Sequence, residues 1–192
     1  MRHRLALAAP AIAILLLASP AAAESTYVGG VEGMLGFPGS FDFNSENITL
    51  EGDTNASFGL VPWIEQKLGD VVGFGGEVMF VWMQPEGAKE RRMVLSPHLR
   101  ARMAFPIIDK VTFDAFIAGG LSMWMPVDDG AGGTDDFRLG WSMRFGFGGS
   151  YAINETVSAY GHLGWYTTTT FGDDITANMH TVPLCVGLRG NF

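Results

Sequence analysis

Eight segments of the chain alternate between large apolar side chains and small or polar ones, and this alternation restricts the possible folds more than any other feature. From residue 137 onward the odd positions hold Phe, Leu, Trp, Met, Phe and Phe, whereas the even positions hold Arg, Gly, Ser, Arg, Gly and Gly. A period of two residues is typical of a β-strand, because successive side chains point to opposite faces of the sheet. The pattern predicts strands at residues 27–37, 54–64, 71–84, 93–105, 111–125, 137–151, 156–168 and 182–192.

The connections between these strands alternate in length. Those after the second, fourth and sixth strands are short, at residues 65–70, 106–110 and 152–155. The others tend to be longer and richer in Gly and Asp, at residues 38–53, 85–92, 126–136 and 169–177. An even-numbered meander with short turns at one end and longer loops at the other is typical of an outer-membrane barrel. The sequence therefore predicts an all-β chain, folded as an eight-stranded antiparallel up-and-down transmembrane β-barrel.

The apolar face of each strand is expected to point outward. A soluble lipocalin-like barrel would instead place its apolar side chains inside and its charges in water. Here the polar face is mostly Gly, Ser and Ala with a few Arg and Glu, which suits the narrow interior of eight strands. A water-facing wall would need many lysines, and the chain has three. Aromatic residues also gather near the strand ends, as they do at the two interfaces of a membrane.

The N-terminal segment predicts export. Residues 1–4 are basic, residues 5–18 are apolar with a break at Pro10, and residues 20–23 supply the small side chains that a signal peptidase recognises. The alternative is an uncleaved membrane anchor, but the apolar run is too short to cross roughly 30 Å comfortably. We therefore expect a cleaved signal peptide at residues 1–23 and an outer-membrane β-barrel domain at residues 24–192.

Composition excludes several classes of function. The chain has 20 acidic against 12 Lys and Arg side chains, and removal of the predicted signal would bring the net charge from −8 to about −10. Such an acidic surface repels phosphate backbones, so no nucleic-acid partner is expected. The single cysteine, Cys185, rules out a disulfide framework and a cysteine-based metal cluster.

The signal, the eight alternating segments, the loop asymmetry and the final Phe192 resemble the small eight-stranded outer-membrane β-barrel proteins of Gram-negative bacteria. This is the family of the outer-membrane protein A transmembrane domain and outer-membrane protein X. The resemblance implies a bacterial outer-membrane location with both termini in the periplasm. It also implies that the C-terminal strand at residues 182–192, ending in the assembly signal Phe192, is recognised by the barrel-assembly machinery.

A polar network is expected to fill the lumen. Counting from the turns places Glu32, Glu77, Arg100, Arg144 and His162 at a similar height on the inward face. Opposite charges in a dry interior neutralise one another, whereas an isolated charge there is very costly.

A second inward group lies nearer the short turns. Arg102 and Asp114 are symmetric about the turn at residues 106–110, so they should be cross-strand neighbours, with Arg189 nearby. His98 shares the inward face of its strand and belongs to the same interior polar network. Pro97 and Pro183 fall inside predicted strands, where each would remove a backbone donor, so we expect either bulges there or strand boundaries at other residues.

The sequence provides weak support for catalysis or metal binding. Ser96 and His98 share one face of a strand, about 7 Å apart, but that face points away from the acyl chains of the membrane. The lipid A deacylase barrels have a His-x-Ser order, and the segment from His162 to Gly164 lacks the serine. The acidic run at residues 128–136 could gather hard cations, but it lacks the spacing of a calcium loop. No catalytic residue, cofactor or metal site is therefore assigned.

These patterns predict an outer-membrane protein with a structural or interaction role and a plugged lumen. The alternatives are an outer-membrane enzyme that modifies lipid A or phospholipid acyl chains, and a narrow ion-conducting pore. Eight strands leave no permanent channel wider than side chains can fill. The expected partners are outer-membrane lipids, lipopolysaccharide and the barrel-assembly machinery, and we expect a monomer.

Overall fold

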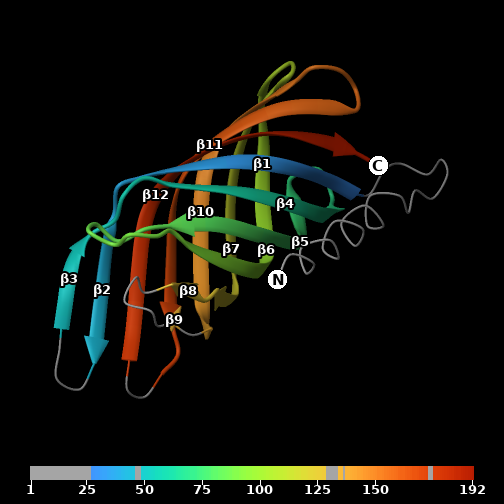
Figure 1. Ribbon diagram of the computed structural model, residues 1–192. Helices are drawn as coiled ribbons and strands as arrows, with labels where there is room; N and C mark the ends of the chain where they lie inside the picture. The colour runs from blue at the N-terminus through green and yellow to red at the C-terminus, as the bar shows by residue number, and fades with distance from the viewer. Residues whose placement is uncertain (1–26, 46–48, 129–133, 136, 173–174) are drawn as a thin grey trace, which may run out of the picture.

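Eight long strands close into an antiparallel barrel in the computed structural model (Figure 1). The structure describes residues 27–45, 49–128, 134–135, 137–172 and 175–192, so the predicted signal peptide lies outside the described residues. Each barrel strand pairs with its neighbours along the chain, and the last strand pairs with the first, which closes the barrel. The strands are β1 (Tyr27–Phe37), β4 (Ser57–Leu68), β5 (Val72–Met83), β6 (Arg92–Ile108), β7 (Val111–Trp124), β10 (Arg138–Ala152), β11 (Val157–Thr170) and β12 (Ile175–Asn191).

The predicted fold class and the predicted number of barrel strands are confirmed. Closure gives both edges of every barrel strand a partner. A strand edge left open in hydrocarbon would keep unpaired backbone groups, each costing several kcal/mol. The seam between β1 and β12 is paired from Val28 with Asn191 to Phe37 with Val182. Beyond it, the backbone nitrogen of Phe192 donates to the carbonyl oxygen of Tyr27 over 2.9 Å.

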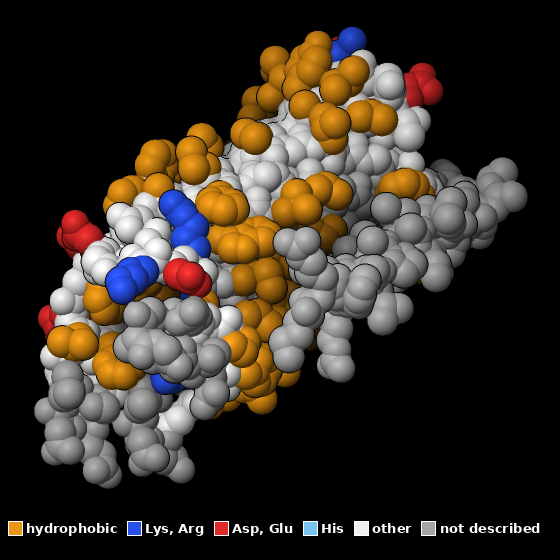
Figure 2. Space-filling view, viewed as in Figure 1, with side chains coloured by type: hydrophobic (Ala, Val, Ile, Leu, Met, Phe, Trp, Pro, Cys, Tyr) orange, Lys and Arg blue, Asp and Glu red, His pale blue; other side chains and the backbone are white. Residues whose placement is uncertain are grey.

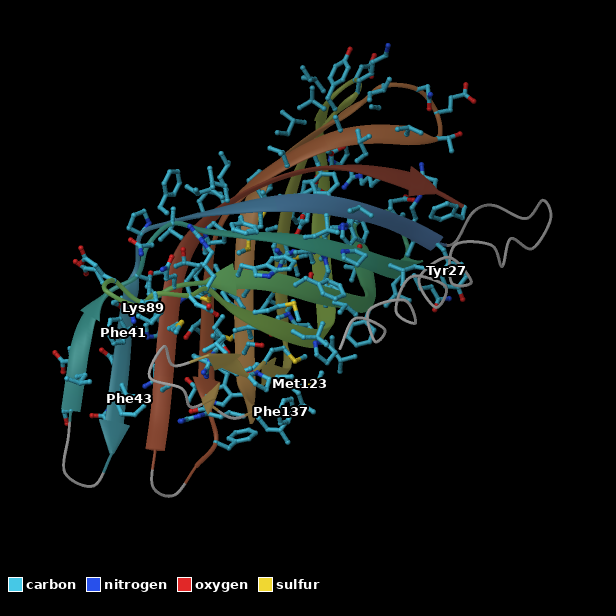
Figure 3. All side chains as sticks on the ribbon, viewed as in Figure 1. Tyr27, Phe41, Phe43, Lys89, Met123 and Phe137 are labelled. Atoms are coloured by element: carbon cyan, nitrogen blue, oxygen red, sulfur yellow. The ribbon has the colours of Figure 1, made fainter. Side chains whose placement is uncertain are left out.

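One predicted loop is largely strand. Residues 38–53 contain β2 (Ser40–Ser45) and β3 (Thr49–Asp53), which pair with each other and extend the barrel wall. Strand β2 also pairs with the first residues of β12, with Phe41 opposite Met179. Figure 3 shows Phe41 and Phe43 on this hairpin, at the opposite end of the barrel from Tyr27. The signal was present in the sequence, because Phe41 and Phe43 alternate with Asp and Asn.

A short strand pair also occurs in the predicted loop at residues 126–136, formed by β8 (Val127–Asp128) and β9 (Thr134–Asp135). The acidic run that was considered for cations lies mostly outside the described residues, at 129–133 and 136.

Neither Pro97 nor Pro183 lies in a bulge, and near Pro183 the strand boundary differs instead, because β12 begins at Ile175 and not at residue 182. Pro97 lies opposite Val78 of β5 with no change of register, and Pro183 lies opposite Gly36 of β1 in the same way. On the other side of each proline the ladder skips two residue pairs and then resumes in the same register. In an antiparallel sheet, successive residues direct their backbone groups to opposite neighbours, so a proline interrupts one ladder and leaves the other intact. Among the described barrel strands, a register shift occurs between Pro106 and Ile108, beside a turn.

The outer wall of the barrel is apolar. Leu99 and Val186 are 67% and 60% exposed, whereas Arg100 next to Leu99 is fully buried. Figure 2 shows apolar side chains over the wall, with the visible charged side chains gathered toward the two ends. A soluble barrel with an apolar interior is therefore excluded, and the wall is suited to a lipid bilayer. Among the described residues, no helix is long and apolar enough to cross a membrane.

Candidate functional site: the barrel interior

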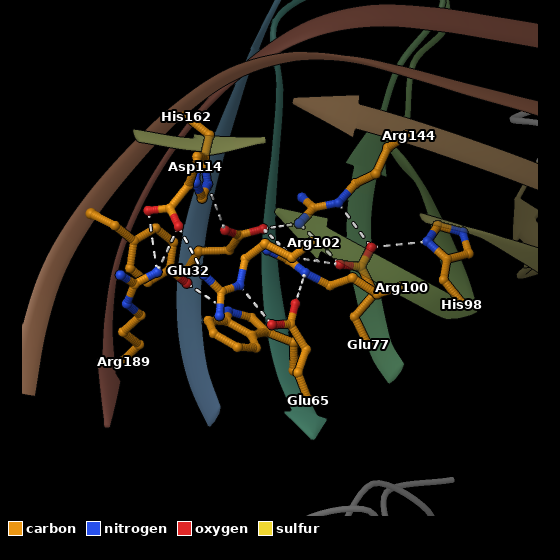
Figure 4. Close-up of polar contacts among 12 residues, drawn as sticks. Glu32, Glu65, Glu77, His98, Arg100, Arg102, Asp114, Arg144, His162 and Arg189 are labelled. Carbon is orange, nitrogen blue, oxygen red and sulfur yellow. Dashed lines mark hydrogen bonds and ion pairs between the residues drawn. The ribbon is translucent and has the colours of Figure 1, made fainter. Parts of the chain in front are cut away.

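Every barrel strand contributes at least one charged or imidazole side chain to the lumen. Each is nearly or fully buried except Arg189, whose side chain is 13% exposed. Figure 4 shows them converging from the surrounding strands. From β1 to β12 they include Glu32, Glu65, Glu77, His98, Arg100, Arg102, Asp114, Arg144, His162 and Arg189. Arg92, at the start of β6, is also buried, and its guanidinium carbon lies 5.8 Å from the ring centre of Trp124.

Glu77 is the centre of the network. Its carboxylate accepts hydrogen bonds from Arg100 Nη1 over 2.8 Å and from Arg144 Nη2 over 3.1 Å. His98 Nδ1 lies 3.0 Å from the same carboxylate. Arg144 also donates through Nη2 to Glu32, and so it joins β10 to both β1 and β5 across the lumen. These contacts link strands on several sides of the lumen.

A second chain of ion pairs leads toward the short turns. Glu65 accepts from Arg100 Nε over 2.7 Å and from Arg102 Nε over 2.6 Å. Arg102 Nη1 donates to Asp114 over 2.8 Å, and Arg189 Nη1 donates to the same oxygen over 3.0 Å. The structure therefore brings together Arg102, Asp114 and Arg189, and Glu65 connects them to the central group.

Glu65 is the member that sequence reasoning missed. The predicted strand ended at residue 64 and assigned Glu65 to a turn, whereas β4 continues to Leu68 and turns Glu65 into the lumen, 1% exposed. Without Glu65 the network would hold three carboxylates and four arginines. With it the numbers of carboxylates and arginines are equal. The missed signal was the continuation of the inward alternation through Trp63, Glu65 and Lys67.

Aromatic rings support the two central arginines. The guanidinium carbon of Arg100 lies 4.7 Å from the ring centre of Trp63 and 4.1 Å from that of Phe116. Arg144 lies 4.5 Å from the same Phe116 ring. Trp63 is itself oriented by a 2.6 Å hydrogen bond from its indole nitrogen to the hydroxyl of Tyr160. A guanidinium on an aromatic face gains cation–π attraction, which adds to the ion pairs in a desolvated site.

The serine beside His98 is not the one that the sequence suggested. Ser96 Oγ lies 3.3 Å from the hydroxyl of Tyr166, whereas His98 Nε2 lies 2.7 Å from Ser142 Oγ on β10. Ser142, His98 and Glu77 thus follow one another in space as a hydroxyl, an imidazole and a carboxylate do in an enzyme with a nucleophilic serine. However, Ser142 is only 1% exposed, and Glu77 is already bound by two arginines. The arrangement satisfies the buried hydrogen-bonding groups of Ser142, His98 and Glu77.

His162 lies beside the central group with less complete pairing. Its Nδ1 is 3.7 Å from Glu32 Oε2, and its ring packs against Phe116 and Tyr160 at centroid distances of 5.2 and 5.0 Å. Within the described part of the chain, both ring nitrogens and Glu32 Oε2 lack hydrogen-bond partners. This is the least satisfied part of the interior.

The described residues contain no group of three or more His, Cys, Asp or Glu side chains that could hold a metal ion. Cys185 is buried on the inward face of β12, 3.8 Å from Arg144 Nη1. The interior is therefore an ion-pair network of carboxylates and arginines, with neutral and imidazole groups at its margins.

Comparison with solved structures supports the barrel fold, whereas comparison with known sequences finds no match. No protein-family profile and no curated protein sequence matches the chain. Neisserial surface protein A (NspA) has a solved structure that superposes with a TM-score of 0.52, at 16% identity over 88% of this chain and 98% of NspA. The chain has the fold of the outer-membrane β-barrel proteins. This result confirms the predicted resemblance at the level of the fold.

Two other outer-membrane barrels match at lower TM-scores. OprG from Pseudomonas aeruginosa gives 0.46, at 12% identity over 86% of this chain and 94% of OprG. Ail, the attachment invasion locus protein of Yersinia pestis, gives 0.39, at 14% identity over 84% of this chain and 98% of Ail.

Proposed function

We propose that this protein is an outer-membrane β-barrel with a structural or interaction role, and that it is not an enzyme. We further propose that its polar interior closes the lumen to ions. The observation that carries the proposal is the enclosed network in which four carboxylates and four arginines bind one another. Eight strands enclose a space that side chains can fill completely, and here the eight charges of this network balance and cross-link the strands.

Location and closure of the barrel are tested together by electrophoresis. We expect the protein in the outer-membrane fraction, and we expect the unheated sample in SDS to migrate as a compact species that shifts on boiling. The reason is that a closed ladder of strands must break cooperatively before detergent can unfold it. A soluble protein without such a shift would contradict the proposal.

Closure of the lumen is tested by single-channel recording in planar bilayers. Arg144 connects Glu32 and Glu77 across the lumen, so Arg144→Ala removes side-chain volume and both cross-links at once. We expect the wild-type protein to be silent and Arg144→Ala to show discrete current steps. Lys89→Ala, in the loop between β5 and β6, is the control and should remain silent. A steady current through the wild-type barrel would favour the pore alternative.

A further inference from the structure

Two cavities lie at the end of the barrel where the short β6–β7 turn is found. One has a volume of 450 Å³ and the other 270 Å³. They share the lining residues Pro106, Thr112, Ser158 and Arg189, so they are parts of one hollow, which we call the turn-end vestibule. The vestibule lies beyond the ion-pair network, on the side of Asp114.

The vestibule is rich in cations. It is lined by Lys67, Arg102, Lys110 and Arg189, against the carboxylates of Asp70 and Asp109. Two of the three lysines in the chain are therefore in this one place, although the protein as a whole is strongly acidic. Lys67 is partly buried beside Arg102 and Arg189, and the carboxylate of Asp70 acts on it with the opposite sign to these two arginines.

The cations of the vestibule differ in how they are held. Arg102 and Arg189 are fixed from behind by Asp114, which accepts a hydrogen bond from each. By contrast, neither Lys67 nor Lys110 forms an ion pair with any of the described residues. Two fixed guanidinium groups and two unpaired ammonium groups thus face the same hollow. Lys67 lines the smaller cavity and Lys110 the larger one, so the hollow holds four cationic side chains against Asp70 and Asp109 in its lining and Asp114 behind the two arginines.

Neutral donors complete the lining. Thr112 and Ser158 line both cavities, and Asn191 lines the smaller one. A phosphate group has several strongly accepting oxygens, so it can receive hydrogen bonds from ammonium and hydroxyl donors placed around it. The volume of the larger cavity leaves room for an organic substituent on the phosphate.

We propose that the turn-end vestibule binds a phosphate ester, with Lys67 and Lys110 as the principal charged contacts. This inference goes beyond the closed lumen, since it concerns only one mouth of the barrel. The same chemistry occurs in a free phosphate ester and in the headgroup of a membrane phospholipid, and the test separates these sources.

The test uses the folded full chain in a maltoside detergent, which contains no phosphate, and titrates sn-glycerol 3-phosphate by calorimetry. We expect saturable binding that is about tenfold weaker in the double variant Lys67→Gln/Lys110→Gln, since each substitution removes a charge-assisted hydrogen bond. Lys89→Gln removes the third lysine, outside the vestibule, and should bind like the wild type. In a second arm, the wild type and the double variant are placed in bilayers of a galactolipid, which contains no phosphate, with and without phosphatidylglycerol.

The outcomes separate clearly. Weaker binding in the double variant, with Lys89→Gln unchanged, supports the site. If phosphatidylglycerol in the bilayer then competes with glycerol phosphate only when both lysines are present, the lipid headgroup is the source. If it does not compete, the source is a free ester. Absence of saturable binding, or equal weakening by Lys89→Gln, would overturn the proposal. Neither result would bear on whether the lumen is closed.

Discussion

Replacement of Glu77 by Gln should lower the free energy of unfolding by about 3–5 kcal/mol, the range for breaking a buried ion pair on one side. The amide has nearly the same volume, so the expected loss comes from charge and not from a cavity. Arg100 and Arg144 would lose a shared carboxylate in a site where they are 0% and 1% exposed. The measurement is equilibrium urea unfolding of the barrel in lipid vesicles, followed by tryptophan fluorescence.

Two further variants separate the effect of charge balance on stability from nonspecific destabilisation. Glu86→Gln changes an exposed carboxylate in the loop after β5 and should stay within about 0.5 kcal/mol of the wild type. Glu77→Gln/Arg144→Met restores equal numbers of acidic and basic groups in the network, so it should recover part of the loss. If the double variant lost more unfolding free energy than the two single variants lose together, charge balance would not be what stabilises the interior.

An arginine in place of Leu99 should have a comparably large effect on the outside of the barrel. Leu99 lies near the middle of β6 and is 67% exposed on the apolar wall. A charged side chain at the midplane of a bilayer costs about 2–4 kcal/mol in a transmembrane barrel. We therefore expect Leu99→Arg to lower the unfolding free energy by that amount and to slow insertion into vesicles.

The matched control is Ile107→Arg on the same strand. Ile107 is 63% exposed, but it lies two residues before the β6–β7 turn, where the cost of a charge falls to about 0–1 kcal/mol. Equal costs at the two positions would show that the wall does not cross a lipid bilayer. The comparison therefore tests the orientation of the barrel face and leaves the central ion-pair network unchanged.

The sequence predicted the strands well and their limits less well. Alternation depends on local steric geometry, so the eight barrel strands and their outward faces could be identified from side-chain type alone. Strand ends have no comparable signal, because polar turn residues and polar inward residues look alike. For this reason the sequence pattern assigns Glu65 to a turn and the β2–β3 hairpin to a loop, whereas both belong to strands.

The partners within the lumen required the closed structure. Sequence position gave the inward face and approximate height of Glu32 and Arg144, but these residues lie on strands far apart in the chain. Ser142 likewise reaches His98 from β10, across β7, which lies between their strands. Such contacts depend on the curvature of the wall and on how far each side chain reaches across the enclosed space.

The sequence by itself thus determined a membrane-type barrel with an apolar wall and a polar interior, because both follow from a two-residue period and from the cost of unpaired backbone in lipid. Only the tertiary structure decided which carboxylate meets which arginine. It also decided that Glu65 balances the network and that two lysines share a hollow at one mouth. These features arise from closure, which brings the inward faces of sequence-distant strands within hydrogen-bond distance of one another.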